Sequence, residues 1–324
     1  MPDRTIYFNG RFVPEGEGRV SIFDSALQFG DMAFESTRTF GGKPFRLREH
    51  LERLYGSMCE LEIQCGLEID QLEAVTHETL ALNAETESSE MEWQIVHNVS
   101  RGPLPLYQAA VETVMRPTVL IYCWPLVSQM GRFAPNYVNG VPLVIPAQRH
   151  IPASLLNPHA KTRSRAHSQL ALLQANRIQP GSWPLLLDPE GFVTEGTSWN
   201  VFLVKKGELI TPDLSQVLEG VSRRTTIDIA RRNGIPVREG ELTRDDLLSA
   251  DEILCTATSF CIVHAAMFEG KRVGDGKQGD VCRQLAAGWK DVVGLDFVAQ
   301  AERFAAELPA WERREREREL RVES

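Results

Sequence analysis

Short apolar runs alternate with helical patterns in the first half of the chain. Residues 5–14 predict a hairpin, because Asn9-Gly10 lies between two strand-like runs and favours a tight turn. A helix is predicted from about Arg48 to Leu61, where apolar residues recur every three or four positions. The other predicted elements are two strands within 33–47, a helix over about 70–82, and strands at 93–100 and 117–126.

The second half repeats this mixture with more strands. A strand is predicted in 141–147, and a helix from about Arg165 to Gln179 that ends at Pro180-Gly181. Residues 185–211 predict a β-meander, and a helix is expected after Gly220. The last predicted elements are strands around 236–237 and 252–258 and a helix near 281–292.

The two halves predict a two-domain protein of the α+β or α/β class. A chain of 324 residues is long for a single hydrophobic core. Residues 127–140 contain Gly and Pro and break the periodicity, so they are the predicted linker. It joins a small N-terminal domain, 1–126, to a larger C-terminal domain, 141–300, and residues 301–324 predict a solvated charged helix.

Composition narrows the classes of function. The net charge is −9 and no basic patch is present, so no nucleic-acid partner is expected. No apolar run approaches the roughly 20 residues that span a bilayer, so no membrane span is expected, and no secretory signal is predicted. The six cysteines form no Cys-x-x-Cys pair, which predicts free thiols, a cytoplasmic location and no metal site.

One acidic residue interrupts the apolar meander. The segment Thr194-Glu195-Gly196-Thr197-Ser198 places a carboxylate and hydroxyl groups among predicted buried strands. A charge near the core of a sheet is costly unless a cation meets it. Glu195 is therefore either an exposed loop acid or the partner of a cationic ligand.

Lys161 lies between a strand-like segment and an amphipathic helix, in NPHAKTRSRAHSQLALLQA. Its two interpretations are a surface lysine and an amine that forms a Schiff base with an aldehyde cofactor. The second role needs an amine that can lose its proton near neutral pH. The nearby Arg163 and Arg165 would favour that loss.

A phosphate site is suggested by LEGVSRRTTIDIARR, residues 218–232. The predicted helix begins after Gly220 with Val221 and Ser222, whose N–H groups and hydroxyl can bind an anion at the helix start. An ordinary N-cap is the alternative. The hydroxyl-rich stretch at Thr258, after the predicted strand EILC, either closes such a site or is a polar loop.

Taken in this order, the motifs resemble those of the class IV aminotransferases, the pyridoxal-phosphate enzymes of fold type IV. The resemblance covers roughly residues 5–290 and implies a small N-terminal α+β domain, a larger cofactor domain with a barrel-like sheet, and a homodimer. The segments that carry it are YFNGRFV, LQFGDMAFESTRTFGGKPFRLREHLERL, LDPEGFVTEGTSWNVFLVKKGELITP, LEGVSRR and ADEILCTATS.

The resemblance also implies roles on pyridoxal 5′-phosphate. Lys161 resembles the lysine that bonds the cofactor and moves a proton, and Glu195 resembles the partner of the pyridine nitrogen. Arg53 resembles the arginine that binds the phosphate. Further phosphate donors are implied at Val221, Ser222 and Thr258, and the loop beside the ring at Thr197, Ser198 and Asn200.

The implied reaction moves the amino group of an amino acid, with the branched-chain type favoured, to a 2-oxo acid such as 2-oxoglutarate. Arg38 matches the branched-chain pattern and is expected at the substrate. Arg163 and Arg165 depart from the family and either bind an acidic substrate group or point to solvent. Aminodeoxychorismate lyase, D-amino-acid aminotransferase and a non-catalytic relative that binds the cofactor or a partner remain alternatives.

Overall fold

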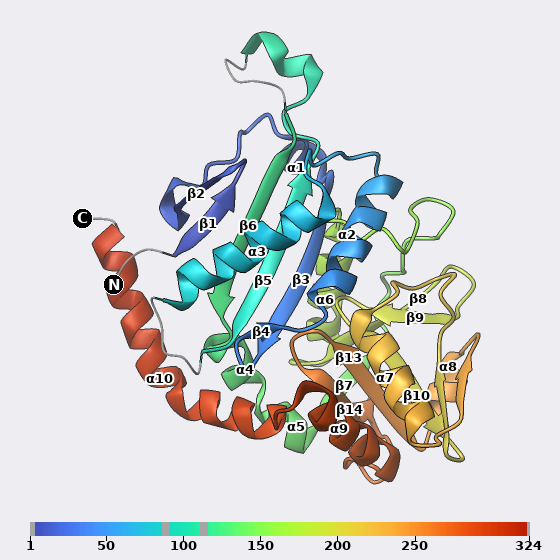
Figure 1. The fold of residues 1–324 in the computed structure, drawn as a ribbon. Coiled ribbons are helices and arrows are strands. Elements are labelled where there is room, and N and C mark those ends of the chain that lie inside the picture. The colour runs from blue at the N-terminus through green and yellow to red at the C-terminus, as the bar shows by residue number, and fades with distance from the viewer. Residues whose placement is uncertain (1–3, 86–90, 111–115, 323–324) are drawn as a thin grey trace. The chain divides into compact units, whose positions relative to one another are not determined.

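The computed structural model describes residues 4–85, 91–110 and 116–322 and divides the chain into two compact units. Unit 1 comprises residues up to Gly131, residues 160–165 and residues from Phe304 onward, and unit 2 comprises 132–159 and 166–303. Both units combine helices with a sheet, as the mixed pattern predicted (Figure 1). The predicted ranges 1–126 and 141–300 are continuous, whereas each unit draws on separate segments of the chain.

Unit 1 is built on an antiparallel sheet. Within the described residues this sheet has six strands in the order β2-β1-β6-β5-β3-β4. The predicted strands WQIVHNVS and PTVLIYCWPL are found as β5 and β6, which pair along their whole length. The strands are β1 Thr5–Phe8, β2 Arg11–Pro14, β3 Met32–Phe40, β4 Lys43–Pro44, β5 Trp93–Ser100 and β6 Thr118–Pro125.

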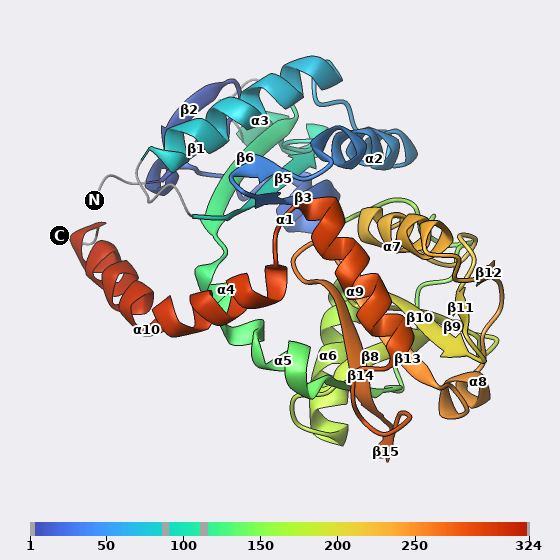
Figure 2. The same cartoon turned by 60° about the horizontal axis from the view of Figure 1, so that its bottom comes forward.

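Two helices, α2 (Leu47–Glu60) and α3 (Ile69–Ala84), lie across one face of this sheet (Figures 1 and 2). Both were predicted to within about two residues at each end. Many apolar side chains of these helices and of β5 and β6 are buried, which gives unit 1 its core. The buried set includes Leu51, Leu54, Leu72, Ile95 and Ile121. The unit also contains α1 (Ser25–Phe29), two short 3-10 helices (Glu15–Glu17 and Pro105–Ala110) and the last part of α10 (Phe297–Val322).

Unit 2 contains a mixed sheet of nine strands, in the order β12-β11-β10-β13-β14-β7-β8-β9 with β15 paired to β14, counted over the described residues. The predicted meander appears as β8, β9, β10 and β11. The sheet curls so that β9, at its end, also contacts β10. Between these two strands the Gly196 N–H donates to Trp199 O at 2.9 Å. The strands are β7 Val141–Val144, β8 Trp183–Leu187, β9 Val193–Gly196, β10 Asn200–Lys205, β11 Glu208–Thr211, β12 Val237–Glu239, β13 Glu252–Ala257, β14 Cys261–Phe268 and β15 Lys271–Arg272.

Helices α7 (Val221–Arg232) and α9 (Asp280–Val293) pack on β13 and β14 and on each other. The indole N–H of Trp289, a fully buried residue of α9, donates to Thr226 Oγ1 of α7 at 3.0 Å. The remaining helices assigned to unit 2 are α5 Pro135–Asn139, α6 Ala166–Ile178 and α8 Arg244–Leu248.

The structure adds elements that the sequence analysis did not predict. Strand β14 lies in the middle of the unit 2 sheet, and its sequence CIVHAAMF carries a histidine and two alanines that weaken a strand pattern. The predicted linker, 127–140, forms two short helices, α4 (Val127–Phe133) and α5. No helix in the described part of the chain is long and apolar enough to cross a membrane.

His97 is a fully buried histidine in β5 of unit 1. Thr76 Oγ1 donates its one proton to Leu72 O at 2.6 Å, so it accepts from His97 Nε2 at 2.9 Å. His97 Nδ1 has no hydrogen-bond partner among the described residues, so a proton placed there would be buried without an acceptor. Burial lowers the pKa of His97 to about 4.

We expect the unfolding free energy to fall by about 3 kcal/mol as the pH drops from above 6.5 to about 4, because only the unfolded state protonates His97 in that window. His97→Gln removes this titration and should flatten the pH dependence of urea unfolding by that amount. His77→Gln, at an exposed histidine on α3, is the control and should keep the wild-type slope. Equal slopes for His97→Gln and wild type would refute the prediction.

Candidate active site

Residues 161–163 extend the sheet of unit 1 along the edge of β3. The Phe34 N–H donates to Lys161 O at 2.9 Å, the Arg163 N–H donates to Met32 O at 2.8 Å, and Thr162 lies opposite Ala33 in an antiparallel bridge. Alternate side chains of an extended segment share a face. Lys161 and Arg163 therefore lie on the same face of the sheet as Phe34.

Helix α2 fixes the backbone of Lys161. The Lys161 N–H donates to Ser57 Oγ at 3.0 Å, and that hydroxyl donates to Arg53 O at 2.9 Å. The Lys161 ammonium lies 4.8 Å from the centroid of the Phe34 ring. The predicted cofactor lysine is thus held by β3 and α2 rather than exposed on a free loop.

Arg53 forms a buried charge cluster with Glu35 and His50 on the opposite face of β3. Its Nε and Nη2 donate to the two Glu35 oxygens at 2.8 and 2.7 Å, and His50 Nδ1 lies 3.1 Å from Glu35 Oε1. Burial alone would raise the pKa of the Glu35 carboxyl, but Arg53 and His50 hold that pKa well below its usual value. Glu35 is therefore an anion that orients Arg53.

Arg163 and Arg165 converge on the ring that Lys161 contacts. The Arg163 guanidinium lies 3.8 Å from the Phe34 centroid and that of Arg165 5.7 Å. Arg163 Nε donates to Asn98 Oδ1 at 2.9 Å. Both guanidinium groups therefore contact a ring of unit 1, while Arg163 as a residue is exposed and Arg165 is half-buried.

Arg38, the other predicted substrate residue, is 1% exposed in β3. Its guanidinium lies 4.0 Å from the centroid of the Phe40 ring, and its Nε donates to Thr39 O at 3.2 Å. Arg38 shares the Phe34 face of the strand because the two residues are four positions apart.

Glu195 lies in β9 of unit 2, and neutral donors hold its carboxylate. Asn200 Nδ2 donates to Oε2 at 3.0 Å and the Leu218 N–H donates to the same oxygen at 3.2 Å. His150 Nε2 lies 3.7 Å from Oε1. Because the side chain is 17% exposed, an anion is fixed here with part of its surface still accessible. This excludes the exposed-loop interpretation of Glu195.

Helix α7 of unit 2 begins as the sequence predicted. Gly220 is its N-cap and provides no side chain to bond the first N–H groups, so within the part of the chain that the structure describes those of Val221 and Ser222 are available to an anion. The Ser222 hydroxyl lies in this first turn. Thr256 Oγ1 is buried and has no partner within the described residues, whereas the predicted Thr258 lies in the turn after β13.

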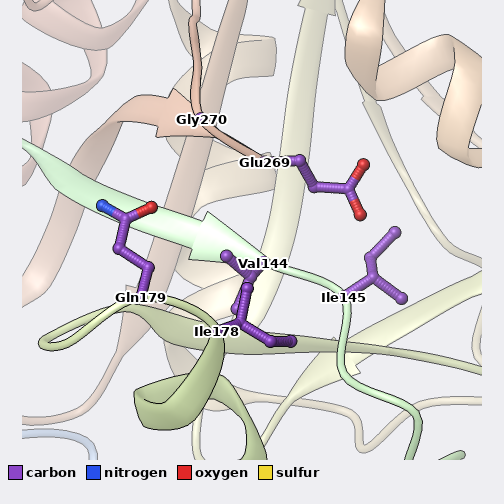
Figure 3. A pocket seen from close by; sticks show the side chains of 6 residues that line it. All are labelled: Val144, Ile145, Ile178, Gln179, Glu269 and Gly270. Carbon is purple, nitrogen blue, oxygen red and sulfur yellow. The ribbon is translucent and has the colours of Figure 1, made fainter.

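Two pockets lie apart from the predicted residues. One, of about 270 Å³, is formed in unit 2 at the ends of β7, α6 and β14 (Figure 3). The other, of about 420 Å³, lies in unit 1 after α2 and includes Cys59 and Cys65. None of the predicted site residues lines either pocket.

The sequence analysis missed three residues of these clusters: Glu35, His50 and His150. His50 and Arg53 are three residues apart and therefore share one face of α2. Glu35 follows Phe34 directly in β3, so the two side chains point to opposite faces of the sheet. These two spacings were available signals for the charge cluster. His150 lies outside any strand or helix and gave no comparable signal.

Comparison with known proteins gives one consistent family. Residues 32–267 match the family model of amino-transferase class IV. A putative branched-chain-amino-acid aminotransferase of Methanocaldococcus jannaschii is 34% identical over 89% of this chain and 96% of its own length. A D-alanine aminotransferase of Bacillus licheniformis is 27% identical over 86% and 94%.

A solved structure agrees with these relatives. The T.th. branched-chain amino acid aminotransferase, in complex with N-(5′-phosphopyridoxyl)-L-glutamate, has a TM-score of 0.79 and 28% identity. The match covers 90% of this chain and 95% of that one. It confirms the predicted fold class.

Gly220→Ala should disturb the support of Glu195. A Cβ at this position would lie 2.1 Å from Asn200 Oδ1, so Asn200 must shift away from Glu195 and Leu218 O. We expect a loss of about 1–3 kcal/mol in unfolding free energy, measured by urea unfolding. Gly56→Ala, in α2 with nothing within 4 Å, is the control and should stabilise by up to about 1 kcal/mol.

The double variant Gly220→Ala/Asn200→Ala separates the contact from other effects. Asn200→Ala removes the side-chain oxygen that the new methyl group would meet. Gly220→Ala should therefore lower the unfolding free energy less in the Asn200→Ala background than in the wild type. Equal costs in the two backgrounds would show that Asn200 does not transmit the effect.

Proposed function

Because the chain belongs to the class IV aminotransferases and is an enzyme that transfers amino groups, we propose that it uses pyridoxal 5′-phosphate to move the amino group of a branched-chain-type amino acid to a 2-oxo acid such as 2-oxoglutarate. The observation that carries the proposal is the placement of Lys161, inside the family match, on the edge of β3 beside Phe34. The phosphopyridoxyl compound in the T.th. enzyme supports the cofactor.

Each unit, taken by itself, contains groups that suit a part of this cofactor. An uncapped helix start, the Ser222 hydroxyl and the unpartnered Thr256 hydroxyl, within the described residues, suit a phosphate, and the fixed carboxylate of Glu195 suits a protonated ring nitrogen. We assign Arg53 to the phosphate, since a guanidinium aligned by a carboxylate is suited to an anion. Val221, Ser222 and Thr258 are assigned to the phosphate as well.

Pyridoxal phosphate supplies an aldehyde and a ring that stabilises negative charge on the carbon next to the amino group. Lys161 provides the amine that takes the proton from that carbon and returns it, which requires a flexible stem and a fixed backbone. Glu195 would meet the ring nitrogen, and two neutral N–H donors, Asn200 Nδ2 and the Leu218 N–H, fix the position of its carboxylate. Arg38 and Arg163 are assigned to the substrate.

D-amino-acid transamination is the second candidate, because the D-alanine enzyme of Bacillus licheniformis matches nearly the whole chain. The branched-chain assignment is preferred because the Methanocaldococcus jannaschii protein is more similar, at 34% against 27% identity. Membership in an aminotransferase family disfavours the non-catalytic relative.

We also propose that the enzyme is a cytoplasmic homodimer. All six cysteines, each of them in the described residues, are free, which suits a reducing compartment. Helix α6 buries small residues and exposes larger ones: Ser168, Ala171 and Ala175 are buried, whereas Leu170 and Leu173 are 50% and 46% exposed. An exposed leucine face on a helix is typical of an interface.

Lys161→Ala should abolish transamination, with kcat reduced by at least about 10³-fold, because no other group is assigned to the proton transfer. Stopped-flow absorption of the bound cofactor during reaction with L-leucine, L-glutamate and D-alanine measures this. Lys271→Ala, at an exposed lysine of β15, is the control and should react as wild type.

The same absorption measurement with the wild-type enzyme distinguishes the proposed L-amino-acid aminotransferase from a D-amino-acid aminotransferase and from a lyase. Reaction with an L-amino acid that a 2-oxo acid reverses supports the proposal, and reaction with D-alanine alone supports the second candidate. If the enzyme instead converts aminodeoxychorismate with release of pyruvate and does not respond to amino acids, its activity is that of a lyase and the proposed transamination is wrong. No cofactor band in the wild type would refute the role of Lys161.

Leu170→Glu/Leu173→Glu should convert the dimer to a monomer, because it places two charges in the proposed interface. Sedimentation velocity measures the change. Gln169→Glu adds a charge on the same helix without replacing a leucine and should remain dimeric. A dimer of unchanged affinity in the double variant would show that α6 is not in the interface.

A further inference from the structure

Three cations surround one aromatic ring in unit 1. Lys161, Arg163 and Arg165 lie 4.8, 3.8 and 5.7 Å from the centroid of Phe34. Cation–π attraction favours each contact individually, but it does not remove the repulsion among three like charges. Such a cluster is stabilised when an anion joins it.

Within the described strands β3, β5 and β6, no carboxylate lies on this face of the sheet. The strand partners of the Phe34 face are neutral or basic, and the nearby Glu35 points to the opposite face, where it binds Arg53 and His50. The residues of the Phe34 face in these strands are Met32, Phe34, Ser36, Arg38, Phe40, Gln94, Val96, Asn98, Ser100, Thr118, Leu120, Tyr122 and Trp124.

Arg163 is the member of the cluster with the best-defined surroundings. Its polar contacts among the described residues are neutral, namely Asn98 Oδ1 at 2.9 Å and the Tyr122 side chain. Burial of the guanidinium lowers the pKa of Arg163, and the contact with Tyr122 only partly opposes this. The residue remains solvent-accessible, so a small anion can reach it.

The geometry also sets the guanidinium for a carboxylate. The guanidinium carbon of Arg163 lies over Phe34 at 3.8 Å from the ring centroid, and the N–H groups of a guanidinium point outward in its own plane. Nε is directed to Asn98, which fixes the rotation of the group. A carboxylate binds such a fixed guanidinium through two parallel hydrogen bonds.

We infer that Arg163 binds the second carboxylate of dicarboxylic substrates such as 2-oxoglutarate and L-glutamate, with Arg165 adding positive charge beside it. The inference rests on the proposed function, in which the substrate reacts at Lys161. Both charged groups contact the same ring, so their separation cannot exceed the sum of their distances to its centroid. One small molecule that reacts at Lys161 can therefore also reach Arg163.

Kinetics of Arg163→Leu and Arg163→Lys in the cofactor-loaded enzyme test this inference. We expect the ratio of kcat/KM for L-glutamate to kcat/KM for L-leucine to fall about tenfold to a hundredfold in Arg163→Leu, mainly through KM. Arg163→Lys should recover part of the loss, since it keeps the charge but not the paired N–H groups. Arg11→Leu, at an exposed arginine of β2, is the matched control and should leave the ratio at its wild-type value.

Binding without turnover provides a second measurement. Glutarate and 4-methylvalerate are a dicarboxylate and a monocarboxylate that cannot react, and their affinities for the loaded enzyme are measured by calorimetry. Arg163→Leu should weaken the binding of glutarate relative to that of 4-methylvalerate. The expected factor equals the fall in the ratio of kcat/KM for L-glutamate to kcat/KM for L-leucine. An equal loss of affinity for both ligands, or an unchanged affinity for glutarate, would overturn the inference.

The two proposals fail in different ways. One outcome is that the wild type transaminates while Arg163→Leu changes neither the ratio of kcat/KM for L-glutamate and L-leucine nor the ratio of affinities for glutarate and 4-methylvalerate. In that case the role of Arg163 is wrong and the proposed function stands. If no amino acid reacts with wild type, the proposed function is wrong. The inference falls with it, whatever the affinity for glutarate.

Discussion

The backbone pairing of residues 161–163 with the edge of β3 is the constraint on which the proposed site residues of unit 1 depend. Two hydrogen bonds, Phe34 N–H to Lys161 O and Arg163 N–H to Met32 O, set the register. A shift of one residue would turn Lys161 to the other face of the sheet. The bond from the Lys161 N–H to Ser57 of α2 adds a third restraint, so the amine is placed by two elements distant in sequence.

β3 also separates charge between its two faces. Glu35 lies beneath α2 and is fully buried, which is tolerated because Arg53 meets both of its oxygens. Phe34, the preceding residue, points to the other face and gathers cations. Removal of Arg53 would leave an uncompensated buried anion, so this arginine stabilises unit 1 in addition to its proposed role on the cofactor.

The local elements were predictable, and the long-range pairings were not. The patterns of 93–100 and 117–126 gave β5 and β6 almost to the residue, and Gly220 marked the start of α7. Nothing in the sequence near Lys161 indicated that it pairs with β3, more than a hundred residues earlier. In α6, Ala171 and Ala175 are buried whereas Leu170 and Leu173 are exposed, because periodicity does not reveal which neighbour covers a helix. The roles assigned to Lys161 and the other site residues remain predictions.

Unit 2 carries its own restraints on the predicted site, and they are coupled. Asn200 Nδ2 donates both to Glu195 and to Leu218 O, and the Leu218 N–H returns to Glu195. Two residues later Gly220 opens α7, with no room for a side chain beside Asn200. The carboxylate assigned to the ring nitrogen and the helix start assigned to the phosphate are therefore parts of one packed segment. Such a segment holds both groups in place before a ligand binds, which lowers the ordering cost of binding.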